Sequence, residues 1–124
     1  MYSEKNEIVK HLLAEVEKAI ETLQDRNADV HSVDDYLTSP EGTKNLAASC
    51  MLLEAIGESF KKVDKITQGT LLSQYPQIPW KAIMGIRDHI AHGYFDIDAD
   101  VIYDSVQNDL APLDAVVKDM TNQL

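Results

Sequence analysis

Four side chains that can bind a phosphate and move a proton lie within eight positions of the chain: Arg87, Asp88, His92 and Tyr94. Arg87 offers a fixed fork of N–H donors, which suits a phosphate and its transition-state charge. His92 can exchange a proton near neutral pH, as attack by a 2′-hydroxyl or departure of an oxygen leaving group requires. These residue types together indicate cleavage of an RNA phosphodiester without a metal.

Each of these residues also has an ordinary structural interpretation. An Arg-x4-His spacing occurs by chance in many helices, and Asp88 with His92, four residues apart, could form only a salt bridge at a helix end. His89 is interpreted as a surface residue rather than a ligand. Tyr94 could be a buried aromatic residue whose hydroxyl is satisfied at the helix end. Residue chemistry alone leaves the catalytic and the structural interpretations open.

Two patterns resemble metal sites, and neither is complete. Residues 96–100 mimic the first half of a calcium-binding loop, but Val101 stands where glycine is needed and Gln107 where the closing glutamate belongs. These aspartates are instead expected to precede and cap the next helix. The His89-x-x-His92 pair lacks a firm third ligand for zinc. The sequence therefore predicts no metal and no cofactor.

The first half of the chain predicts two long helices. Apolar residues recur at helical spacing over residues 4–25, and residues 25–37 are predicted to be a connection with about one helical turn. Ser39-Pro40-Glu41 predicts the start of the second helix, with the Lys61-Lys62 pair in its last turn. Gly57 costs this helix about 1 kcal/mol relative to alanine. It indicates either a close helix contact or a merely tolerated glycine.

The second half is predicted to form shorter helices, because strand signals are nearly absent. Two prolines fix the extended segment before the Arg-to-Tyr residues, and Gly93 is the expected helix stop. In chain order, the expected helices are 67–74, 79–92, 98–106 and a last one from Asp109. The fold class predicted is all-α: an up-and-down helical bundle of four to six helices in one domain, residues 1–124.

A continuous helix over residues 79–92 would not aim Arg87 and His92 at the same atom. Side chains five residues apart point about 140° from each other around the helix axis. Asp88 and His92, four apart, stack on one face. Either the long Arg87 side chain swings toward the histidine, or a second copy of the helix completes the site.

Composition predicts a cytoplasmic protein. Apolar residues make up 44% and charged residues 26% of the 124 residues, a balance typical of soluble globular proteins. No apolar run approaches the roughly 18 residues of a membrane span, and no secretory signal opens the chain. Cys50 is the only cysteine, which excludes an intrachain disulfide and a cysteine-based zinc site.

The net charge of −10 repels nucleic acid as a whole. An RNA-directed function therefore needs a local basic site or a partner's surface. Lys61, Lys62 and Lys65 form the one basic cluster evident in the sequence, and their position relative to Arg87 decides whether they give RNA a path. The alternative is that the acidic residues serve only solubility.

Residues 87–94 match the pattern Arg-x4-His-x-Tyr, and three flanking segments agree with it. Ile56-Gly57-Glu58, Pro79-Trp80 and Phe95-Asp96-Ile97-Asp98 resemble the corresponding segments of HepT-like toxins in the HEPN superfamily. The chain resembles this family over most of its length, most strongly from about 46 to 106.

The resemblance implies an HEPN-like homodimer formed through the motif helices, in which two copies of Arg87 and His92 line one cleft. In the family these two residues belong to a metal-independent endoribonuclease, and Asp88 fills its favoured polar position. The resemblance further implies a minimal nucleotidyltransferase antitoxin as partner. This antitoxin silences the toxin by transferring AMP to Tyr94, and the two proteins can form an assembly larger than the toxin dimer. AMP would place a negative phosphate beside Arg87, where it competes with RNA. The alternative is a non-catalytic interaction module that binds and assists such a nucleotidyltransferase.

Overall fold

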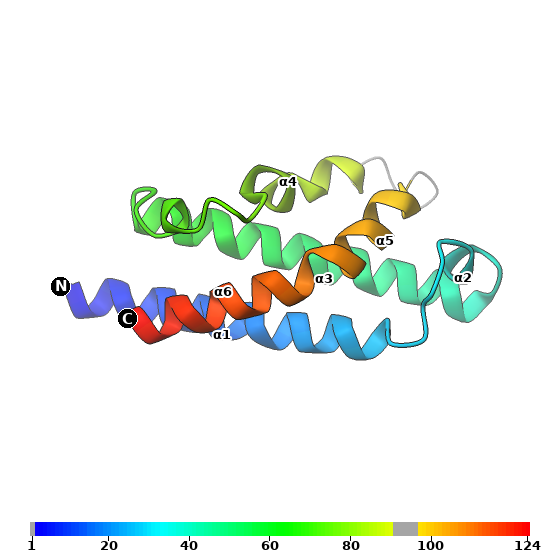
Figure 1. Cartoon of the computed structure of the whole chain (residues 1–124), viewed down its shortest axis with the longest axis horizontal. Helices are drawn as coiled ribbons and strands as arrows, with labels where there is room; N and C mark the ends of the chain where they lie inside the picture. The colour runs from blue at the N-terminus through cyan, green and yellow to red at the C-terminus, as the bar shows by residue number, and fades with distance from the viewer. Residues whose placement is uncertain (1, 91–96) are drawn as a thin grey trace.

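Two long antiparallel helices form the frame of the molecule. The computed structural model describes residues 2–90 and 97–124. In it, α1 (Tyr2–Arg26) and α3 (Pro40–Ile66) pack against each other, as Figure 1 shows. Apolar residues at helical spacing line the contact, and Leu13, Ile20 and Phe60 are fully buried there. The all-α prediction is confirmed.

The start of α3 follows from its capping residues. Ser39 is extended, and its Oγ accepts a hydrogen bond from the backbone N–H of Gly42 at 3.0 Å. Pro40 occupies the first helical position, where its missing N–H costs nothing. The predicted helix start is confirmed.

The end of α3 lies beyond the predicted one. Lys65 is the basic residue of the last turn, so the expectation that Lys61-Lys62 would occupy that turn was wrong. The physical reason is that the apolar stripe continues through the fully buried Val63. The extra turn places Lys61 along the side of the bundle rather than at its end.

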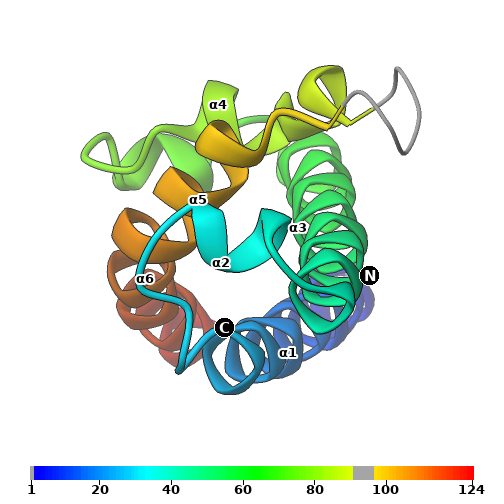
Figure 2. The ribbon, with the colours of Figure 1, turned by 90° about the vertical axis from the view of Figure 1, so that its right-hand side faces the viewer.

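A single helical turn, α2 (Asp34–Leu37), lies across one end of the bundle (Figure 2), in agreement with the predicted connection. The Tyr36 hydroxyl donates to Asn27 Oδ1 at 2.6 Å, and Asn27 Nδ2 donates to Ser49 Oγ at 3.0 Å. All three residues are buried, and burial raises the pKa of Tyr36 to about 12. Because these buried polar groups are hydrogen-bonded, they tie α2 to α1 and α3.

The second half of the chain completes an up-and-down bundle. Helix α3 is followed by three short elements: the 3₁₀ helix η1 (Leu72–Gln74), α4 (Trp80–Met84) and the 3₁₀ helix η2 (Ile86–His89). Of these, α4 and η2 contact α3. Helices α5 (Ala99–Asn108) and α6 (Leu110–Gln123) then return, and α6 packs on α1 with both termini at the same end (Figure 1). None of the described helices combines the length and apolar character needed to cross a membrane.

The segment predicted as one helix over residues 79–92 contains a break. Gly85 N–H donates to the Lys81 carbonyl oxygen at 2.9 Å, which is the last bond of α4. Asp88 N–H then donates to the Gly85 carbonyl oxygen at 3.0 Å, the shorter loop of a 3₁₀ helix. The single-helix prediction was therefore wrong, and the side-chain angle derived from it does not apply.

Close packing on α3 accompanies this break. A Cβ added at Gly57 would lie 2.7 Å from the carbonyl oxygen of Ile83, so the backbone of α4 rests directly on α3. Ile83 and Ile86, on either side of the break, are both buried. The tighter turn keeps both side chains in the core. Of the two interpretations of Gly57, the close helix contact is confirmed.

Candidate active site

Arg87 projects from η2 with 63% of its side chain exposed. Its Nε lies 3.8 Å from Oε1 of Glu54 in α3. An exposed ion pair of this length contributes only about 0–1 kcal/mol, whereas a phosphate can accept paired, charge-assisted hydrogen bonds from a guanidinium. Glu54 thus lies beside Arg87 but leaves most of the Arg87 side chain open to an anion.

The end of η2 is tied to the start of α5. His89 Nδ1 lies 3.9 Å from Asp98 Oδ2, and the backbone N–H of Asp98 donates to the His89 carbonyl oxygen at 3.4 Å. Asp98 Oδ1 also accepts the N–H of Val101 at 3.4 Å, so it caps α5 as predicted. His89 is exposed, in agreement with its interpretation as a surface residue.

The structure places two of the four predicted site residues. Arg87 and Asp88 are both exposed neighbours that line one groove. His92 and Tyr94 lie outside the described residues, as does Gly93, the predicted helix stop. The catalytic roles of Arg87, Asp88 and His92, and the role of Tyr94 as acceptor, stay predictions.

Three cationic side chains and one acidic side chain line the groove beside Arg87. It encloses about 510 Å³ and contains Lys61 from α3 and Lys81 from α4; we call it the Arg87 groove. Its lining residues are Lys61, Trp80, Lys81, Met84, Gly85, Arg87 and Asp88. Of the predicted lysine cluster, Lys61 reaches the groove, and its Nζ lies 3.2 Å from Oε1 of Glu58. Lys62 and Lys65 do not line it.

Sequence reasoning missed the contributions of Trp80, Lys81 and Glu54 to this groove and its border. For Lys81 a signal existed: it and Arg87 are the only lysine or arginine residues between Lys65 and Lys118. Trp80 was recognised only as part of a flanking segment. The approach of Glu54 to Arg87 depends on how α3 packs, which residue spacing does not show.

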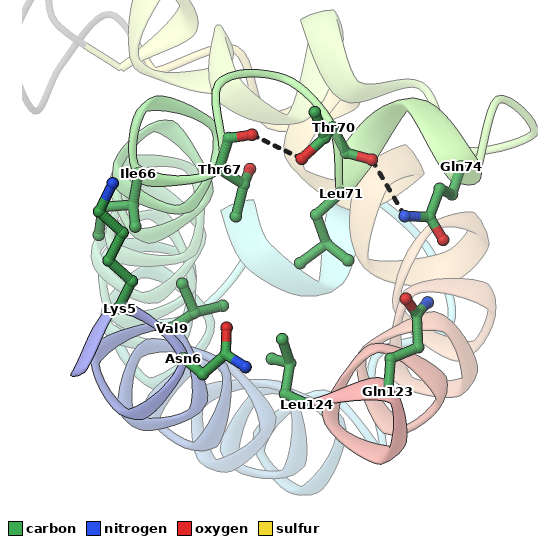
Figure 3. Close-up of a pocket in the computed structure, with 10 residues that line it drawn as sticks. All are labelled: Lys5, Asn6, Val9, Ile66, Thr67, Thr70, Leu71, Gln74, Gln123 and Leu124. Carbon is green, nitrogen blue, oxygen red and sulfur yellow. Dashed lines mark hydrogen bonds between the residues drawn. The ribbon is translucent and has the colours of Figure 1, made fainter. Parts of the chain in front are cut away.

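A second hollow, of about 270 Å³, opens at the end of the bundle where both termini lie (Figure 3). Leu71 and Leu124 point into it. The side chains of Thr70 and Gln74 donate hydrogen bonds to the nearby carbonyl oxygens of Thr67 and Thr70. Among the described residues that line this hollow, Lys5 has the one charged side chain, and none has a histidine or carboxylate side chain. Without a group that moves a proton at neutral pH, it is the weaker candidate for a catalytic site.

An antiparallel helical bundle with a groove that contains the arginine of an Arg-x4-His-x-Tyr segment has the features of an HEPN-like protein. Residues 16–120 match the model of the family described as Ribonuclease HepT-like. The chain belongs to this HepT-like family.

Three relatives show the extent of the likeness. A Methanocaldococcus jannaschii protein named "Putative RNase" is 31% identical over 73% of this chain and 72% of its own length. A Caldanaerobacter subterraneus protein, also named "Putative RNase", is 29% identical over 90% and 89%. "Probable ribonuclease HepT" of Thermococcus cleftensis is 28% identical over 84% and 87%. No solved structure matches the chain.

Proposed function

We propose that this protein is the toxin of a toxin–antitoxin pair and acts as a metal-independent endoribonuclease. The observation that carries the proposal is the exposed Arg87, which shares a groove with Lys61 and Lys81, in a chain of the HepT-like family. The relatives named as ribonucleases support the reaction class.

The proposed reaction needs one phosphate-binding group and one proton carrier. Arg87 holds the non-bridging phosphate oxygens while the ribose 2′-oxygen attacks phosphorus and the bond to the 5′-oxygen breaks. Two protons move: one leaves the 2′-hydroxyl and one reaches the departing 5′-oxygen. His92 exchanges one of them and water exchanges the other. The products are a 2′,3′-cyclic phosphate and a 5′-hydroxyl. Asp88 is proposed to act beside Arg87 and His92, since it lines the same groove as Arg87.

Substitution of the two central residues tests this proposal. Arg87→Ala and His92→Ala are each expected to slow RNA cleavage by about 10² to 10⁴ and to relieve growth arrest on overexpression. Arg26→Ala and His11→Ala, at exposed positions of α1, are the matched controls and should leave both readouts unchanged. Full cleavage and arrest by both site variants would refute the proposal.

The proposed off-switch is transfer of AMP from ATP to Tyr94 by a minimal nucleotidyltransferase encoded beside the toxin. The tyrosine oxygen attacks the α-phosphorus of ATP and pyrophosphate leaves. Intact mass after incubation with that partner and ATP should show added AMP units, and Tyr94→Phe should abolish the gain. Tyr103→Phe, which loses a hydrogen bond to the His31 carbonyl oxygen, is the control and should keep it.

The proposed enzyme is a homodimer whose site takes residues from both copies. Met51 on α3 is 69% exposed, and it lies three residues before Glu54, the partner of Arg87. Methionine is an adaptable contact residue, and Met51 is the position proposed for contact between the two copies.

The net charge of −10 supports a second candidate function, a non-catalytic module that binds and assists a nucleotidyltransferase. A basic partner would be attracted by this charge, whereas RNA would be repelled from most of the surface. Co-purification with the neighbour-encoded protein, together with no RNA cleavage at high protein concentration, would favour this alternative.

A further inference from the structure

Basic residues concentrate in one part of this acidic chain. Residues 61–87 contain five lysine or arginine residues and one acidic residue, a local charge of +4 within a total of −10. Three of these cations, Lys61, Lys81 and Arg87, line the Arg87 groove, where Asp88 is the only acid among the lining residues. Glu58 and Glu54 border the groove, 3.2 Å from Lys61 and 3.8 Å from Arg87, and offset part of this charge. The acidic charge is still lower here than over the rest of the surface, so a polyanion is repelled least at this groove.

An aromatic side chain forms part of the same groove and is fixed in place. Trp80 Nε1 donates to the Tyr75 carbonyl oxygen at 3.0 Å. The indole packs edge-on against the ring of Phe60, with 4.9 Å between the ring centroids. The Tyr75 hydroxyl donates to Asp119 Oδ2 and accepts from Gln123 Nε2, both at 2.6 Å. These contacts connect the indole to α3 and α6 and limit its rotation.

The indole is nonetheless only partly buried. Besides the Arg87 groove, it lines an adjoining hollow with Pro79, Ala82 and His89, and Lys81 borders both. A rigid, half-exposed aromatic ring next to cations is the arrangement by which proteins bind single-stranded nucleic acid, since every base has a face that can stack. Bases in a duplex are already stacked and paired, so they cannot use it.

We propose that Trp80 and Lys81 form a subsite for one unpaired nucleotide of the RNA, adjacent to the phosphate that Arg87 binds. The base stacks on the indole of Trp80, and Lys61 and Lys81 contact the neighbouring phosphates. The subsite makes the protein select single-stranded RNA with little preference for base identity. This inference rests on the proposed ribonuclease function and adds its substrate class.

Trp80 is the only tryptophan of the chain, so its fluorescence reports on the subsite alone. The probe is a single-stranded 2′-O-methyl oligoribonucleotide, which cannot be cleaved through the 2′-oxygen, with a labelled version for anisotropy. Saturable quenching of Trp80 is expected at the same oligonucleotide concentrations as the anisotropy change. The duplex of the same sequence should bind at least about tenfold more weakly without quenching.

Variants separate the subsite from general attraction. Lys81→Ala should weaken binding about three- to tenfold, whereas Lys44→Ala, the same charge change at an exposed position near the start of α3, should not. Trp80→Ala should weaken oligonucleotide binding about tenfold or more. Trp80→Phe keeps a ring against Phe60 and should weaken binding less than Trp80→Ala does. Melting temperatures show whether each variant is folded, and the wild-type quenching assay needs no substitution at all.

Three results would overturn the inference: anisotropy without quenching, equal losses in Lys81→Ala and Lys44→Ala, or no binding of the oligonucleotide. Because the probe cannot be cleaved, the outcome is independent of the chemistry of Arg87 and His92. Quenching by the probe with no cleavage of unmodified RNA would keep the subsite and refute the ribonuclease. Cleavage without quenching would keep the ribonuclease and refute the subsite.

Discussion

Glu54 places a negative charge 3.8 Å from the Nε of the arginine proposed to bind the scissile phosphate. The carboxylate can orient Arg87, and it also competes with the phosphate for the same guanidinium. The pair is exposed, so the orienting effect is worth at most about 1 kcal/mol. Because the phosphate meets this repulsion in every encounter, we expect competition to be the larger effect.

Glu54→Gln is therefore expected to lower the KM for RNA about two- to fivefold with little change in kcat. Steady-state cleavage of a single-stranded substrate measures both constants. Glu41→Gln, which removes the same charge from the first turn of α3, is the control and should leave KM unchanged. A tenfold fall in kcat for Glu54→Gln would show instead that the carboxylate positions Arg87.

At the scale of elements, the contact between Gly57 and α4 holds the groove in shape. Alanine normally stabilises a helix interior by about 1 kcal/mol relative to glycine. At Gly57 the added methyl would lie 2.7 Å from the Ile83 carbonyl oxygen, which forces α4 away from α3. We expect Gly57→Ala to destabilise the protein by about 1–3 kcal/mol and to weaken RNA binding, because Trp80 and Lys81 move with α4.

Urea unfolding of Gly57→Ala beside Ala55→Gly measures this effect. Ala55 is exposed two residues earlier in the same helix, so its substitution shows the intrinsic cost of glycine there, about 1 kcal/mol. Both changes should destabilise the protein, although propensity alone predicts opposite signs. A stabilised Gly57→Ala variant would contradict the close contact.

The elements show how far sequence reasoning reaches. Local signals sufficed for α1 and for the start of α3, where helical periodicity and the Ser39-Pro40 cap act within a few residues. The break at Gly85 was missed, because the periodicity of residues 79–92 is compatible with one helix. The break accompanies close packing of α4 on Gly57, a residue far away in the sequence.

In the site, too, local sequence signals identified some residues, whereas packing between distant residues determined the rest. Arg87 and Asp88 were found from residue chemistry, and the structure places them on one groove. The groove itself was not predictable, because Lys61 and Lys81 come together only when α4 folds back on α3. The lysine that matters most for the proposed RNA path, Lys81, also stands outside the basic cluster that sequence inspection singles out.

At the scale of the whole molecule, buried ionisable groups should limit stability at alkaline pH. Burial, with a smaller effect of the Glu54 charge, raises the pKa of Cys50 from its ordinary 9.0 to about 11. Burial likewise raises the pKa of Tyr36 from 10.0 to about 12. Above about pH 9 the unfolded chain loses protons that the folded protein keeps, so the free energy of unfolding falls as pH rises. Below pH 9 this contribution is fully present.

Urea midpoints between pH 7 and pH 11 measure this dependence. Cys50→Ala should flatten the decline between about pH 9 and pH 11, because the variant no longer has the thiol whose proton is held on folding. The difference in free energy of unfolding between Cys50→Ala and wild type at pH 7 measures the cost of any cavity that the substitution creates, and it is subtracted at each higher pH. A pH dependence identical to that of the wild type would contradict the raised pKa of Cys50.

The composite site proposed for the dimer can be tested by mixing inactive copies. If each site takes Arg87 from one copy and His92 from the other, a dimer of Arg87→Ala with His92→Ala contains one site with both residues intact and one with neither. Random pairing of equal amounts should then restore about a quarter of the wild-type activity, because half the dimers are mixed and each has one working site. Each variant alone should stay inactive, and the mixture is assayed after co-expression so that the copies pair as they fold.

Met51→Asp in both chains is expected to abolish the restored activity if the exposed face of α3 mediates pairing. No restored activity in mixed dimers isolated with two different affinity tags would mean that Arg87 and His92 act within one chain.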